Sequence, residues 1–110
     1  MTPTNDKVML REERKGADER YLWAYLDDEG SLHIDGQDLG PSTGPVSPDG
    51  EYEWFTTIRA PHVAELSELL GCPPGDAILG VLESRYSGDA SYELERIIRE
   101  SHLPVERFSC

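Results

Sequence analysis

The spacing of apolar residues changes once along this chain, and that change limits the folds open to it. Within residues 8–59, four stretches repeat similar side chains at every second position, which is the period of a β-strand. From residue 61 onward the apolar residues recur every three or four positions, as in an amphipathic helix. Strands followed by helices favour an α+β fold, with an antiparallel sheet of four to five strands and three helices on one face.

Four stretches of the first half have the strand pattern: VMLREER from Val8, RYLWAYLDD, SLHID and EYEWFTTIR. The turn DDEG joins the second to the third as a hairpin. We expect the second strand to point Leu22, Ala24 and Leu26 to one face and Tyr21, Trp23 and Tyr25 to the other. In the third and fourth strands the inward residues would be Leu32, Ile34, Tyr52, Trp54, Thr56 and Ile58.

Three helices are predicted in the second half. Pro61 suits the first position of a helix and Gly71 its end, while Asp89 or Ser91 would cap the third helix and Pro104 would stop it. The tail VERFSC is expected to add a short closing strand. The inward stripes of the three helices would be Val63, Leu66, Leu69 and Leu70, then Ile78, Leu79, Leu82 and Tyr86, then Leu94, Ile97 and Ile98.

The run DGQDLG, residues 35–40, lies where the third strand pattern stops and a stretch rich in Pro and Gly begins. We expect Asp35 and Asp38 to accept backbone N–H bonds and to shape a turn that leads into a long mobile loop, 39–50. A loose calcium site is the alternative. The EF-hand spacing fails, because the sixth and twelfth residues counted from Asp27 are Leu32 and Asp38.

Familiar catalytic and metal-binding spacings are not found in the sequence. Ser31, His33 and Asp35 would share one side of a strand, but residues two apart are separated by about 6.6 Å, too far for a catalytic triad. The His and Cys residues have no zinc spacing, and no phosphate-binding loop is present. We therefore expect neither a metal nor a cofactor. Cys72 and Cys110 are expected to be free thiols.

Charge is the strongest functional signal. The formal net charge is −12, which disfavours binding to nucleic acid or anionic membranes. The stretch Tyr21–Ile58 contains no Lys or Arg, although it is rich in aromatic residues. Aromatic anchors among carboxylates suit an interface with a basic protein. The plainer interpretation is that the aromatics are core strand residues and the acids occupy turns and an outer face. The candidate partner-binding residues are Asp35, Asp38, Asp49, Glu51, Glu53 and Phe55.

The length and the termini complete the expectations. A chain of 110 residues predicts one domain, 1–110, with residues 1–6 disordered. No apolar stretch approaches the roughly 20 residues that span a bilayer. The start has no basic segment followed by an apolar one, as a signal peptide would have, so a cytoplasmic location is expected.

The segments YLWAYLDDEGSLHIDGQDLG, EYEWFTTIRAPHVAELSELLG and SHLPVERFSC resemble a small, uncharacterised group of bacterial proteins, common in actinobacteria. The shared pattern is GQDLG, then EYEW, then a tail P-x-E-F-x-S. The tail departs from it at Leu103 and Arg107, where the group has Ile and Phe. The resemblance supports the fold prediction and covers most of the chain beyond Arg20. Some small acidic proteins of this kind are suspected immunity proteins of toxin systems.

The resulting hypothesis is a non-catalytic binding protein, most concretely an immunity-type inhibitor of a basic protein such as a toxin. Two alternatives remain open. One is a small hydrolase-like or metal-assisted enzyme that uses Asp38, His33 and Glu53 beside the 39–50 loop. The other is a structural homodimer that pairs through its sheet.

Overall fold

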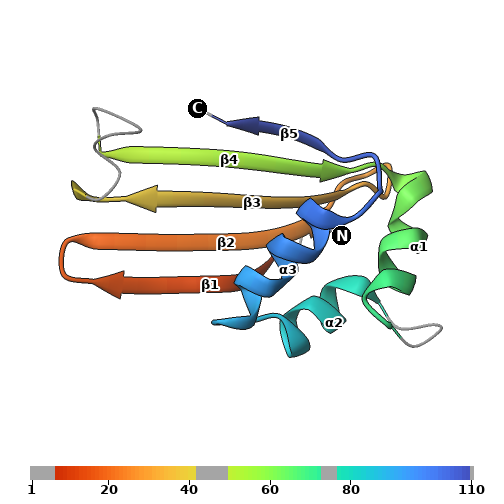
Figure 1. Cartoon of the computed structure of the whole chain (residues 1–110), viewed down its shortest axis with the longest axis horizontal. Helices are drawn as coiled ribbons and strands as arrows, with labels where there is room; N and C mark the ends of the chain where they lie inside the picture. The colour runs from red at the N-terminus through yellow and green to blue at the C-terminus, as the bar shows by residue number, and fades with distance from the viewer. Residues whose placement is uncertain (1–6, 42–49, 73–76, 110) are drawn as a thin grey trace.

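Five strands form a single antiparallel sheet in the order in which they occur along the chain, β1-β2-β3-β4-β5. The computed structural model describes residues 7–41, 50–72 and 77–109, so the predictions for residues 1–6 and for most of the 39–50 loop lie outside the described residues. The three helices lie between β4 and β5 in the chain, which confirms the predicted α+β fold (Figure 1). The elements are β1 Val8–Lys15, β2 Asp18–Leu26, β3 Leu32–Leu39, β4 Glu51–Ile58, α1 Ala60–Leu69, α2 Ile78–Arg85, α3 Ala90–Glu100 and β5 Glu106–Ser109.

The helices cover one face of the sheet. In Figure 1, α3 crosses in front of the strands, and α1 and α2 lie near the end of the sheet at which β4 ends. The core lies between the two layers, and its sheet side follows the predicted alternation. Its residues are Leu10, Leu22, Ala24, Leu32, Ile34, Trp54, Ile58, Leu66, Leu70, Ile78, Leu82, Leu94 and Ile98.

One detail of the predicted helices is wrong, and a second is confirmed only in part. Leu69 is 51% exposed, because successive helical residues are about 100° apart and the buried stripe of α1 is centred on Leu66 and Leu70. Asp89 occupies the N-cap position of α3 but makes no side-chain cap hydrogen bond. The first N–H of α1 obtains its partner from another segment, since the Ala60 N–H donates to Ser31 Oγ at 3.1 Å.

A β-bulge in β1 turns a charged residue toward the helices. Met9 lies opposite Trp23, and the next aligned pair is Arg11 with Leu22, so Leu10 is the extra residue. Leu10 and Arg11 are consequently both buried. The bulge thus places a guanidinium group under α3, in a strand that otherwise alternates.

The prediction of a turn at DGQDLG is wrong, because β3 continues through this run to Leu39. Gly36 is a strand residue aligned with Leu22 and with Trp54. A Cβ atom at Gly36 would lie 2.1 Å from Cζ2 of Trp54, so this glycine leaves room for the indole ring. The strand ends just before Gly40, whose φ of 118° disfavours other residues and whose N–H donates to the carbonyl of Gly50 at 2.8 Å.

Candidate functional site on two faces of the sheet

Aromatic side chains gather on the sheet face that the helices leave uncovered. The register places Tyr21, Trp23 and Tyr25 there, alternating with the buried Leu22 and Ala24. Phe55 of β4 stacks on Phe108 of β5 with ring centroids 6.1 Å apart, and Phe108 is 65% exposed. Phe55, one of the candidate partner-binding residues, therefore lies on this face. This face, here called the uncovered face, also carries Met9, Glu12, Arg14, Glu19, His33, Asp35, Gln37, Leu39, Glu51, Glu53, Thr57 and Glu106.

Asp35 lies at the centre of the uncovered face and is only 4% exposed. It is flanked by Trp23 on β2 and Phe55 on β4. Its Oδ1 atom is buried and has no hydrogen-bond partner. Burial raises the pKa of this carboxyl, although the charges of His33 and Lys7 and the backbone N–H of Thr56 act against the rise.

The Asp35 carboxyl lines a hollow of about 400 Å³ whose other lining residues are Lys7, Trp23 and Tyr25. The ammonium group of Lys7 lies 5.2 Å from the centroid of the Trp23 ring, within the range of a cation–π contact. The hollow therefore combines aromatic walls, an unpaired acceptor and a ring that already faces a cation.

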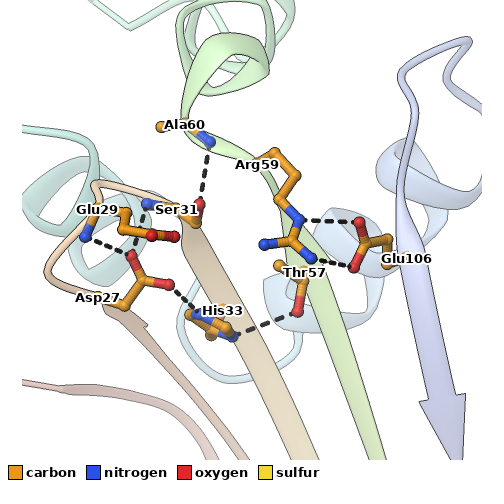
Figure 2. A network of polar contacts seen from close by, with 8 residues as sticks. All are labelled: Asp27, Glu29, Ser31, His33, Thr57, Arg59, Ala60 and Glu106. Carbon is orange, nitrogen blue, oxygen red and sulfur yellow. Dashed lines mark hydrogen bonds and ion pairs between the residues drawn. The ribbon is translucent and has the colours of Figure 1, made fainter.

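A polar network joins the strands at one end of the uncovered face (Figure 2). His33 stacks on Tyr25 with ring centroids 4.7 Å apart, and its Nε2 lies 2.8 Å from Asp27 Oδ2. Its Nδ1 lies 3.3 Å from Thr57 Oγ1. The contact with His33 is the main cause of the lowered pKa of Asp27. These bonds brace the β2–β3 turn against β4, so we interpret His33 as a structural residue.

The Ser31, His33 and Asp35 trio is not a catalytic triad. Ser31 is buried and its hydroxyl accepts the Ala60 N–H, while His33 bonds to Asp27 and Thr57. Figure 2 shows Ser31 and His33 engaged with these separate partners. A triad requires the histidine to lie between the hydroxyl and the carboxylate, and this arrangement does not meet that condition.

The opposite face holds a second candidate site, here called the inner cavity. It has a volume of about 560 Å³ and lies between α3, the C-terminal segment and the inward side of the sheet. Its lining residues are Arg11, Ile34, Asp38, Tyr52, Trp54, Thr56, Tyr92, Glu95, Ile98, Arg99, Ser101, Leu103, Val105 and Arg107.

A buried ion pair closes one side of the inner cavity. Arg11 Nη2 donates to Glu95 Oε1 at 2.6 Å, and Trp54 Nε1 donates to Glu95 Oε2 at 3.0 Å. The guanidinium also donates to Ser91 Oγ at 2.9 Å and lies 3.6 Å from the centroid of the Tyr92 ring. The Arg11 side chain is 2% exposed and the Glu95 side chain 24%, so the guanidinium is shielded from water while the carboxylate is partly exposed. This network ties β1, β4 and α3 together.

Asp38 is the second acid of DGQDLG, and it points toward the inner cavity. The register places it between Arg20 of β2 and Tyr52 of β4. Its Oδ1 atom is buried without a hydrogen-bond partner. Burial raises the pKa of Asp38, while the charges of Arg20 and Arg11 act in the opposite direction.

The structure divides the six candidate partner-binding residues among three locations. Asp35, Glu51, Glu53 and Phe55 lie on the uncovered face, Asp38 lies on the opposite face, and Asp49 is outside the described residues. Because a residue's parity in the strand decides its face, two acids three positions apart must separate once β3 runs through both.

The same separation removes the proposed catalytic trio. His33 and Glu53 belong to the uncovered face, whereas Asp38 lines the inner cavity. The sheet lies between them, so they share no cleft. The sequence interpretation missed Lys7, which the structure places beside Trp23, and the Arg11–Glu95 pair, which depends on a bulge that no sequence signal marked.

Within residues 7–41, 50–72 and 77–109, no three His, Cys, Asp or Glu side chains are grouped so as to hold a metal ion. Cys72 is a half-buried free thiol. Over the same ranges, no helix combines the length and the apolar character needed to cross a membrane. No family model matches the chain, and no curated protein or solved structure matches it.

Proposed function

We propose that this protein binds a basic protein partner through its uncovered face and performs no chemistry of its own. The observation that carries the proposal is Asp35, a buried carboxyl whose Oδ1 atom has no partner at the centre of an aromatic surface. A buried carboxylate oxygen without a donor is costly, and a Lys or Arg side chain from a partner would supply the donor that Oδ1 lacks. Trp23 and Tyr25 would then flank the incoming cation.

The acids around the aromatic centre favour a basic partner over a second copy of the chain. Glu12, Glu19, Glu51 and Glu53 lie on the uncovered face, where Arg14 pairs with Glu12 and Glu19, so the face keeps an excess of acids. The net charge of the chain is −12. Two such faces would repel each other, whereas a cationic surface would be attracted and steered to the site. This supports a heteromeric complex rather than the homodimer.

The immunity-type inhibitor is the concrete form of the proposal. A nuclease-type toxin must attract a polyanion and therefore presents a basic surface around its active site. An acidic face with aromatic anchors could cover such a surface and block it. The uncovered face needs no catalytic group for this role, in agreement with the separation of Asp38 from His33 and Glu53.

The test starts with affinity capture on the full chain, followed by kinetics with the purified captured protein at several salt concentrations. Glu51→Lys with Glu53→Lys should slow association at low salt and reduce its salt dependence, since rim charges act mainly on encounter. Phe55→Ala should instead speed dissociation. The matched control is Glu68→Lys with Glu83→Lys, which changes the net charge equally at exposed positions on α1 and α2.

Equal association rates for the wild type and the Glu51→Lys, Glu53→Lys variant would refute the proposed surface. If the Glu68→Lys, Glu83→Lys control slowed association by the same factor, only the net charge of the chain, and not the uncovered face, would govern the association rate. A concentration-dependent dimer that Phe108→Arg dissociates would support the homodimer instead.

A further inference from the structure

The inner cavity has the size and lining of a small-molecule site. Its volume of about 560 Å³ falls within the roughly 300–1,000 Å³ of typical ligand pockets. Aromatic rings from both layers form its walls: Tyr52 and Trp54 from β4, with centroids 5.6 Å apart, and Tyr92 from α3. Ile34 and Ile98 add apolar surface. A flat, apolar molecule would bury its faces well against these walls.

One acceptor in the cavity is left for a ligand. Both carboxylate oxygens of Glu95 are engaged, one by Arg11 and the other by Trp54. Asp38 Oδ1 is buried and unpartnered, and it belongs to a residue that lines the cavity. A ligand that donates an N–H or O–H to this atom would satisfy a group that the protein itself leaves unsatisfied.

The cations around the cavity restrict the charge of that donor. Arg99 and Arg107 line the cavity, and Arg20 lies beside Asp38 in the sheet, whereas the charge of Arg11 is already paired with Glu95. A ligand ammonium group would meet these charges, whereas a neutral N–H or O–H would not. We propose that the inner cavity binds a small, neutral, ring-containing apolar molecule that donates one hydrogen bond to Asp38. The site is separated from the uncovered face by the sheet and does not depend on the partner proposed above.

The probes are indole and 1-methylindole, which have similar shapes and differ in the N–H donor. Each is titrated into the full chain at pH 7 and followed by amide chemical shifts in two-dimensional NMR. Indole should shift the residues that line the inner cavity and bind with a dissociation constant of about 1 mM or below. 1-Methylindole should bind about tenfold more weakly, because it cannot donate to Asp38.

Variants on the two faces make the test specific. Asp38→Ala should weaken the binding of indole by about tenfold and leave the affinity for 1-methylindole nearly unchanged. This difference isolates the contribution of the hydrogen bond. The matched control is Asp35→Ala on the uncovered face, which should not change either affinity. Thr56→Phe, which fills the cavity from β4, should abolish both; Val105→Trp at the C-terminal side replaces it if the first variant does not fold.

Three results would overturn the proposal. The first is no shift of the lining residues at 5 mM indole, a concentration about five times the expected limit. The second is equal affinity for the two probes, and the third is equal weakening by Asp38→Ala and Asp35→Ala.

Discussion

Asp35 and Asp38 are three residues apart on one strand, yet they belong to different halves of the molecule. Each has a buried oxygen without a partner, and burial raises the pKa of each. Asp35 is surrounded by aromatic rings on the uncovered face, whereas Asp38 lies near Arg20 and Arg11 under α3. The difference teaches that β3 contributes one acid to the hollow on the uncovered face and another to the inner cavity on the opposite face.

The largest expected effect separates the two tryptophans. Trp54 is 6% exposed, and its replacement by Ala should lower the free energy of unfolding by about 3–5 kcal/mol, since it leaves a cavity in the core. Trp23 is half-buried on the uncovered face, so Trp23→Ala should lower the free energy of unfolding by only about 1–2 kcal/mol. Urea denaturation measures both. Equal losses in the free energy of unfolding would mean that Trp23 on the uncovered face is packed as tightly as Trp54 in the core.

Removal of the Glu95 carboxylate should have the next largest effect. Glu95→Ala leaves the buried Arg11 guanidinium without its counterion, and we expect a loss of about 3 kcal/mol in the free energy of unfolding. The control is Arg96→Ala on the same helix, whose partners Glu93 and Glu100 are exposed, with an expected loss of about 0.5 kcal/mol or less. Chemical denaturation measures both variants. A similar loss in the free energy of unfolding for Glu95→Ala and Arg96→Ala would show that the Arg11–Glu95 pair does not stabilise the packing of α3.

Gly36 tests the close approach of Trp54 to β3. Gly36→Ala would place a Cβ atom within the indole ring, so we expect a loss of about 1–3 kcal/mol. Gly80→Ala is the control, because nothing lies within 4 Å of its Cβ position in α2, and Ala should stabilise this helix by about 0.5–1 kcal/mol. Thermal melting of the two variants should move in opposite directions. A Gly36→Ala variant that melts at the wild-type temperature would show that the Trp54 indole moves aside without cost.

The smallest effect compares the two acids directly. Because the pKa of Asp35 is raised in the folded state, the folded protein binds the proton more tightly than the unfolded chain, and the stability that protonation provides is lost as the pH rises through the raised pKa. Asp35→Asn should therefore raise the free energy of unfolding by about 1 kcal/mol at pH 7.

The gain from Asp35→Asn should shrink below the raised pKa and vanish below the ordinary value of 3.8. Asp38→Asn should raise the free energy of unfolding by less, since nearby Arg20 and Arg11 offset the cost of the Asp38 charge. Urea denaturation from pH 3 to 7 measures both differences. If Asp38→Asn raised the free energy of unfolding more than Asp35→Asn, the charge of Asp35 rather than that of Asp38 would be the better compensated by its surroundings.

Much of the fold could be predicted because the period of the apolar residues was clear. The alternation in β2 and β4 and the closing strand are found in the structure. The helical stripes are found too, except that Leu69 is exposed and that Val81, which was not in the predicted stripe, is buried. The failure came at DGQDLG, where Gly36 was interpreted as a turn residue. A glycine in a strand gives the same local signal as a glycine in a turn, and only its distant neighbour distinguishes the two.

The sequence by itself determined the α+β class, the order of strands and helices, and the acidic, aromatic character of Tyr21–Ile58, since these follow from local period and composition. Only the tertiary structure decided that β3 continues to Leu39, because the Trp54 indole needs the space that Gly36 leaves. That contact sends Asp35 and Asp38 to opposite faces, and the bulge in β1 brings Arg11 to Glu95. Such outcomes depend on residues far apart in the chain, whose contacts exist only after the sheet and the helices have packed.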